Sequence, residues 1–99
     1  MLALLNGSLR LLSDGGLSGV FRVYLQWNDG QKPYLLVDNI LTELREGRNK
    51  NNVLYWESDV PDGTKEISMT FHDGGGGGVL QVELEREAGT IYLPTTEWA

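Results

Sequence analysis

Three segments of this 99-residue chain alternate between apolar and polar residues, and this alternation limits the fold more than any other feature. The segments are residues 19–27, 66–72 and 79–86. In the first of them, Arg22 and Tyr24 share one face, and Phe21 lies on the opposite face. A period of two residues is typical of strands that bury one side. Short links between successive strands predict antiparallel pairing.

One stretch departs from this pattern and predicts a helix over residues 38–47. Apolar residues recur with the i, i+3, i+4, i+7 spacing of a helix face, at Val37, Ile40, Leu41 and Leu44. Asp38 suits the N-cap of this helix, and Gly47 suits its end. Because so short a helix is unstable alone in water, it must pack on the sheet. We therefore expect an α+β domain, an antiparallel sheet of about five to six strands covered on one face by this helix.

Two further features concern the segments between these elements. Residues 2–12 fit either a hairpin of two strands, because of Asn6-Gly7, or a helix, because of their leucine spacing. Of these two alternatives, we favour strand. Clusters of Gly, Asp, Ser and Pro predict turns at residues 13–16 and 60–63.

Composition narrows the class of protein. About 100 residues is the commonest size of a single core, so residues 1–99 are expected to form one domain. The absence of cysteine excludes a disulfide framework, cysteine zinc sites and thiol catalysis. No apolar run reaches the ~18 residues of a membrane span, and no targeting peptide is recognised. The expectation is a cytoplasmic protein without a membrane partner.

Charge is distributed unevenly along the chain. Residues 1–56 hold six basic and five acidic side chains, a formal charge of +1, whereas residues 57–99 hold two basic and nine acidic ones, a charge of −7. Such a field repels phosphate backbones and attracts basic surfaces. The sequence therefore predicts a basic protein partner and no nucleic-acid binding.

No pattern for catalysis or for a cofactor is found. The five glycines Gly74, Gly75, Gly76, Gly77 and Gly78 lead into an alternating strand rather than a helix, so they do not form a phosphate-binding loop. We interpret them as a flexible hairpin loop. The chain has one histidine, so a metal site would lack a second imidazole ligand. We predict no catalytic residue, no metal and no cofactor, and hence a protein that is not an enzyme.

Partner-binding residues are instead predicted from acids and aromatic side chains on polar strand faces. Tyr side chains beside acids have the composition of protein-interface hot spots. By alternation, one member of the Tyr55/Trp56 pair should face outward. The predicted partner-binding set is Glu83, Glu85, Glu87, Glu57, Tyr24, Tyr55 and Trp56. A homodimer is a further hypothesis, formed through an edge strand near residues 32–36 or 91–93.

The order of these elements has a familiar layout. The segments are Val37-Asp-Asn-Ile-Leu-Thr-Glu-Leu44, then Asn51-Asn-Val-Leu-Tyr-Trp-Glu57, Glu66-Ile-Ser-Met-Thr-Phe71 and Val79-Leu-Gln-Val-Glu83. As helix, strand, strand and strand, they resemble immunity proteins of bacterial polymorphic toxin systems, including those that neutralise deaminase toxins. The resemblance covers about residues 20–93. It implies a non-enzymatic inhibitor that blocks the active site of a toxin.

Other functions compete with an inhibitor that binds a basic protein. A small-ligand binding domain would use a pocket between the predicted helix 38–47 and the sheet. An acidic protein of a mobile genetic element, without catalytic activity, would have the same composition. Glu83 and Glu85 also lie two residues apart on one strand face, as paired acid and base carboxylates would in an enzyme.

Overall fold

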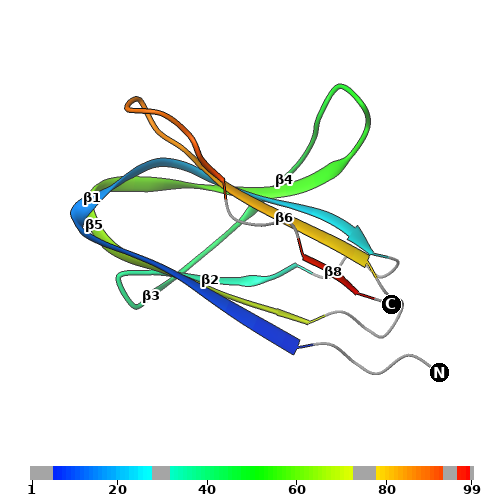
Figure 1. Ribbon diagram of the computed structural model, residues 1–99, viewed down its shortest axis with the longest axis horizontal. Helices are drawn as coiled ribbons and strands as arrows, with labels where there is room; N and C mark the ends of the chain where they lie inside the picture. The colour runs from blue at the N-terminus through cyan, green and yellow to red at the C-terminus, as the bar shows by residue number, and fades with distance from the viewer. Residues whose placement is uncertain (1–5, 28–31, 73–77, 93–95, 99) are drawn as a thin grey trace.

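The computed structural model describes residues 6–27, 32–72, 78–92 and 96–98, which form an antiparallel sheet of eight strands (Figure 1). The strands are β1 (Asn6–Trp27), β2 (Tyr34–Val37), β3 (Ile40–Thr42), β4 (Arg45–Arg48), β5 (Leu54–His72), β6 (Gly78–Glu85), β7 (Ile91–Tyr92) and β8 (Thr96–Trp98). Their order is β3-β2-β5-β1-β6-β7, with β4 added to β5 and β8 added to β6. None of the described residues is helical, so the predicted α+β class is wrong, and none forms a helix long and apolar enough to cross a membrane.

The two longest strands, β1 and β5, bend together and divide the sheet into two layers, as Figure 1 shows. Layer I contains β4, β6, β7 and β8 with residues 19–27 of β1 and 54–60 of β5. Layer II contains β2 and β3 with the other ends of β1 and β5. Pairing between β1 and β5 shifts register twice at the bend, between Leu12 and Leu17 and between Leu17 and Gly19. Such irregularities bend a strand and increase its twist.

The hydrophobic core lies between the two layers. Phe21 and Val23 of layer I and Leu35 and Ile67 of layer II are fully buried in one cluster. The apolar face that each alternating segment creates is thus covered by the other layer of the same sheet. This explains why no helix is needed to cover the apolar face.

The predicted helix over residues 38–47 is instead a hairpin followed by a further strand. Asp38 and Asn39 have φ values of 47° and 64°, which a two-residue β-hairpin turn requires and an α-helix forbids. Asp38 caps no helix: one carboxylate oxygen accepts hydrogen bonds from the backbone N–H groups of Lys65 and Glu66, at 3.0 and 2.9 Å. The turn is therefore tied to β5. A ligand pocket between a helix and the sheet has no counterpart in the described residues.

Several predicted loops and edges also change place. Residues 13–16 and 60–63 are not turns between strands but the bends of β1 and β5. Residues 6–12 are strand, the favoured alternative, but Asn6-Gly7 pairs with β5 inside β1 and is not a hairpin turn. Residues 2–5 lie outside the described residues. The predicted edge at residues 32–36 is wrong for Leu35 and Leu36, because β2 pairs there with both β3 and β5. At the other predicted edge, residues 91–93, β7 pairs with β6 alone among the described strands, and Leu93 lies outside the described residues.

The glycine segment does not link paired strands. Gly78 is the first residue of β6, and Gly74–Gly77 lie outside the described residues. Since β1 lies between β5 and β6 in the sheet, the segment between these two strands is not a hairpin loop.

Candidate protein-binding face

Polar side chains form a continuous row across the outer face of layer I. The backbone register places Arg45 of β4 opposite Glu57 of β5, Glu57 opposite Arg22 of β1, and Arg22 opposite Glu83 of β6. Directly opposed residues of neighbouring strands point to the same side. Because Phe21 and Val23 point into the core, this row points away from it. We call this row, with Tyr24, Tyr55, Asp59 and Glu85, the layer I face.

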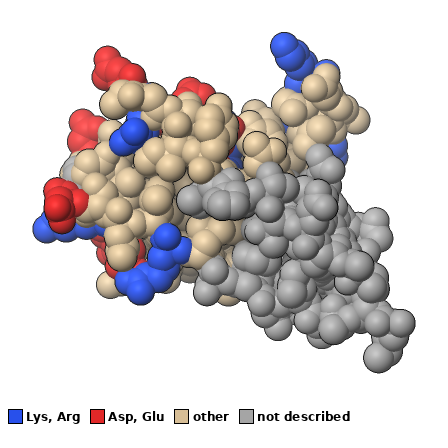
Figure 2. All heavy atoms as spheres, viewed as in Figure 1, with Lys and Arg blue, Asp and Glu red and all other residues tan. Residues whose placement is uncertain are grey.

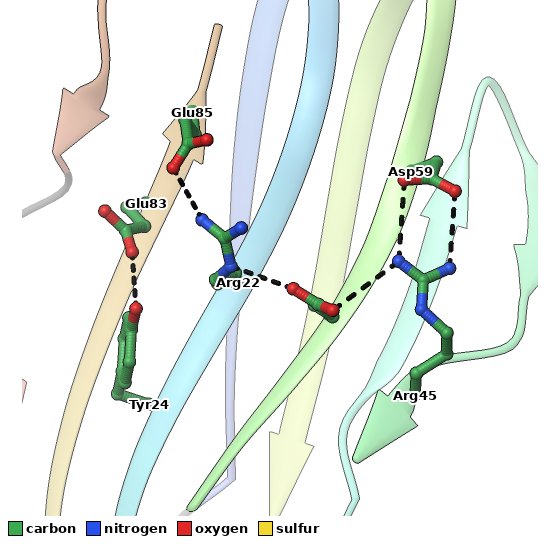
Figure 3. Close-up of polar contacts among 7 residues, drawn as sticks. Arg22, Tyr24, Arg45, Asp59, Glu83 and Glu85 are labelled. Atoms are coloured by element: carbon green, nitrogen blue, oxygen red, sulfur yellow. Dashed lines mark hydrogen bonds and ion pairs between the residues drawn. The ribbon is translucent and has the colours of Figure 1, made fainter. Parts of the chain in front are cut away.

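Arg22 is the centre of an ion-pair network on this face (Figure 3). Its Nε lies 2.8 Å from Glu57 Oε2, and its Nη1 lies 2.9 Å from Glu85 Oε2. The Arg22 and Glu57 side chains are each only 21% exposed, so water screens this pair weakly. Burial alone would lower the pKa of Arg22, but its hydrogen bonds to Glu85 and Glu57 raise that pKa above its ordinary value. Arg22 therefore stays charged and holds both carboxylates.

Arg45 extends the network to the edge of the sheet. Its Nη2 lies 3.7 Å from Glu57 Oε1, and its guanidinium reaches both carboxylate oxygens of Asp59 at 3.4 Å (Figure 3). Two arginines from the first half of the sequence are thereby set among carboxylates of the second half. Figure 2 shows acidic and basic groups interspersed over the described part of the side in view.

Tyr24 and Glu83 form a second polar pair beside this network. The Tyr24 hydroxyl donates a hydrogen bond of 2.7 Å to Glu83 Oε1 (Figure 3). Burial, together with this hydrogen bond to a carboxylate, raises the pKa of Tyr24 from 10.0 to about 12. A nucleophilic tyrosine would need a lowered pKa, so the environment of Tyr24 does not activate it as a nucleophile.

Tyr55 supports Tyr24 from the neighbouring strand. The two ring centroids are 5.5 Å apart with the planes tilted by 55°, a favourable aromatic geometry. On its other side Tyr55 covers Gly47, where an added Cβ would come within 2.5 Å of the ring. Gly47 thus leaves room for the Tyr55 ring against β4. The prediction that Gly47 ends a helix is wrong.

A shallow hollow of about 310 Å³ opens next to the Tyr24–Glu83 pair. Its lining comes from β1 and β6 and from the turn between β4 and β5: Tyr24, Gln81, Glu83, Asn49 and Val53. Asn49 fixes that turn, because its side-chain oxygen accepts hydrogen bonds from the backbone N–H groups of Asn51 and Val53. Within the described part of the chain, no Lys or Arg is ion-paired with Glu83. Glu83 is therefore the carboxylate of the face that is left for an external cation.

The structure brings together most of the residues predicted for partner binding. Five of them lie on the layer I face: Tyr24, Tyr55, Glu57, Glu83 and Glu85. Glu87 is exposed in the turn between β6 and β7, away from this row. Trp56 packs against the core from the opposite side of β5, and its Nε1 is buried without a hydrogen-bond partner.

The sequence-based set omits the basic members of the face. Arg22 could have been predicted from the sequence, since strand alternation already places it on the same face as Tyr24. Arg45 could not have been predicted, because it falls within the predicted helix. Asn49, Val53 and Gln81 become recognisable only when the strand order brings β6 beside β1.

Metal binding finds no support in the described residues, where no three His, Asp or Glu side chains gather in a way that would hold a metal ion. Glu83 and Glu85, although close on β6, are turned to different partners, Tyr24 and Arg22. The face therefore presents one tyrosine-bound carboxylate and one arginine-bound carboxylate, not a converging pair.

We predict that one of the four tyrosines ionises about two pH units later than an ordinary tyrosine, because the pKa of Tyr24 is raised to about 12. The folded state holds this proton more tightly than the unfolded chain does. The resulting stabilisation is complete below about pH 10 and is lost as the pH rises from 10 to 12. Tyrosinate absorbance followed through this range in a pH titration measures the late step.

Three variants assign this step. Y24F should remove it, and Y92F, which alters a tyrosine that is 66% exposed, should leave it in place. E83Q should lower the pKa of Tyr24 only in part, because burial is the larger cause of the shift. A late step that survives in Y24F would contradict the assignment.

Comparisons with protein-family models, with curated proteins and with solved structures of other proteins gave no match to this chain.

Proposed function

We propose that this protein is a non-enzymatic binding protein that takes a Lys or Arg side chain of a basic protein partner beside Tyr24 and Glu83. The observation that carries the proposal is the Glu83 carboxylate, which borders a hollow, is oriented by the Tyr24 hydroxyl and is in no ion pair within the described residues. A cation in this hollow would contact both a carboxylate and the ring of a tyrosine, and both groups attract cations.

The surrounding charges support a basic partner. The layer I face has two arginines against four carboxylates, which leaves a formal charge of −2, and the chain as a whole has −6. This field increases the rate at which a basic protein arrives and repels nucleic acid. Tyr24 and Tyr55 add an aromatic surface of the kind found at interface hot spots. The ion pairs of Arg22 join β1 to β5 and β6, so little ordering of these side chains is needed on binding.

Neutralisation of a toxin is the specific case that the sequence resemblance suggests. Residues 37–44, which supply the helix of that layout, form a hairpin and its continuation, so the proposal depends on the face and not on the layout. An inhibitor would act by covering a basic surface of the toxin. Cells that produce a deaminase toxin should grow when they also produce the wild-type protein, and should not grow when they produce E83Q instead. This result would support the case.

The general proposal is tested with defined probes. Oligo-arginine and oligo-lysine peptides are added to the isotope-labelled protein, with oligo-glutamate as the negative control, and backbone amide shifts are followed by NMR. We expect the basic peptides to shift amides around the hollow. E83Q should weaken the binding by about tenfold, which corresponds to about 1.4 kcal/mol.

E87Q is the matched control, because it removes the same charge from the same region of sequence but away from the face. We expect E87Q to bind as the wild type does. If E83Q and E87Q weaken binding equally, attraction by the net charge alone explains the result, and the proposed site is wrong.

A further inference from the structure

Strand β3 is an apolar edge on the opposite layer from the Tyr24–Glu83 site. Within the described part of the chain it pairs only with β2. Ile40 and Leu41 are 69% and 66% exposed, and Tyr34 of the adjacent strand is 68% exposed. Residues 40–42 include no Lys and no Pro, which commonly protect a sheet edge from pairing with another chain.

At one residue of β3, the backbone N–H and C=O groups point away from β2, toward the free edge of the sheet. Asp38 and Asn39 form a two-residue turn, so Val37 and Ile40, which flank it, form the hydrogen-bonded pair of the hairpin. Consistent with this alternation, the N–H of Asp38 donates to Glu66 O of β5 at 2.9 Å. The next pair joins Leu36 and Leu41 and is not hydrogen-bonded. The N–H and C=O groups of Leu41 therefore point away from β2, toward the free edge.

We propose that a second copy of this chain pairs antiparallel with β3, with the two Leu41 residues directly opposite each other across a two-fold axis. The outward backbone groups of Leu41 would then exchange hydrogen bonds with those of Leu41 in the second copy. Ile40 would lie opposite Thr42 of the second copy on the other side of the sheet. The short edge is thus complementary to itself, as a two-fold interface requires.

Strand β3 itself has no charged residue, which favours a second copy over a strongly charged partner. Residues 32–43 carry a formal charge of −1, from Lys32, Asp38 and Glu43. Asp59 and Asp62 of β5 also line the hollow beside Ile40, so we expect salt to strengthen the association. Lys32 and Glu43 are also paired with each other. Two hollows flank the strand, one of about 290 Å³ beside Ile40 and one of about 260 Å³ beside Leu41. They leave room for the exposed side chains of the second copy.

The register is tested by single cysteines, since the chain has none of its own. Opposed residues of a hydrogen-bonded pair have Cα atoms about 5.5 Å apart, within the range of a disulfide, whereas diagonal neighbours are about 7–8 Å apart. L41C should therefore form a covalent dimer under mild oxidation. I40C, at a position of nearly equal exposure, should stay mostly monomeric. Equal cross-linking of both variants, or of neither, would overturn the proposal.

Sedimentation velocity tests the association without a cross-link. We expect the mass of the wild-type protein to rise toward twice that of the monomer between micromolar and near-millimolar concentration, and L41K to remain monomeric. Y92K is the matched control, because Tyr92 has the same exposed fraction as Leu41 and lies on another edge strand, β7. Circular dichroism verifies that both variants are folded. A wild type that stays monomeric throughout, or a Y92K variant that loses association as L41K does, would refute the β3 interface.

Discussion

Substitution of Gly19 by alanine is expected to lower the free energy of unfolding by at least about 3 kcal/mol. Gly19 has a φ of 124°, a conformation that L-residues rarely adopt. An added Cβ would also lie 1.9 Å from the carbonyl oxygen of Glu85. That oxygen belongs to the backbone of β6, so no side-chain rotation relieves the clash, and β1 and β6 would have to separate where the network of Arg22 begins. Urea denaturation measures the loss.

Gly63 provides the control for backbone strain without a clash. It lies at the bend of β5 with a φ of 85°, and an added Cβ would have no atom within 4 Å. G63A should therefore lose only about 1–2 kcal/mol. If G63A is destabilised as strongly as G19A, conformational strain explains both losses, and close packing of β1 against β6 at Gly19 is not important for stability.

The strands were predictable from sequence, and the way they are covered was not. The alternating segments 19–27, 66–72 and 79–86 lie almost entirely within β1, β5 and β6, because a period of two residues has no other regular explanation. The bends at residues 13–16 and 60–63 have the composition of turns, and a bend inside a long strand needs the same residues. Sequence therefore predicts two short strands where the structure has one strand crossing between layers.

The false helix has an equally specific cause. The spacing of Val37, Ile40, Leu41 and Leu44 suits a helix face, yet Val37 and Leu44 are buried while Ile40 and Leu41 are exposed. The Asp38-Asn39 pair, both residues tolerant of positive φ, was the signal for a hairpin. Over so few apolar residues, the spacing of a helix face and that of a hairpin overlap. Contacts of the hairpin with β5 decide which structure forms.

The candidate face was only partly predictable, because it depends on the order of the strands. Local alternation places Tyr24 and Arg22 on one side of β1, and Glu83 on the polar side of β6. Succession along the chain suggests that β5 and β6 are neighbours, whereas in the sheet β1 separates them. This order sets arginines of a nearly neutral half among the carboxylates of an acidic half. The net charge of a segment therefore overestimates the charge that its surface offers to a partner.

Replacement of Arg22 by methionine is expected to destabilise the protein by about 2–3 kcal/mol, measured by urea denaturation near neutral pH. Methionine preserves most of the apolar stem of the side chain but leaves Glu57 with only its longer contact to Arg45, and Glu85 without its ion pair. Glu57 is only 21% exposed, so its remaining charge is poorly hydrated. R22M/E57Q should recover part of the loss, because the partner charge is removed as well.

R10M is the matched control for this prediction. Arg10 pairs with Glu66 at 3.1 Å on the outer face of layer II, but the Arg10 side chain is 62% exposed. An exposed ion pair contributes little to stability, so R10M should cost less than about 1 kcal/mol. No recovery in R22M/E57Q would show that the loss does not come from the uncompensated charge of Glu57. Equal losses in R22M and R10M would show that Arg22 contributes no more than a surface residue does. The layer I face would then owe its rigidity to backbone pairing and to the packing of Tyr24 against Tyr55, and the binding site beside Glu83 would have to be held by those contacts alone.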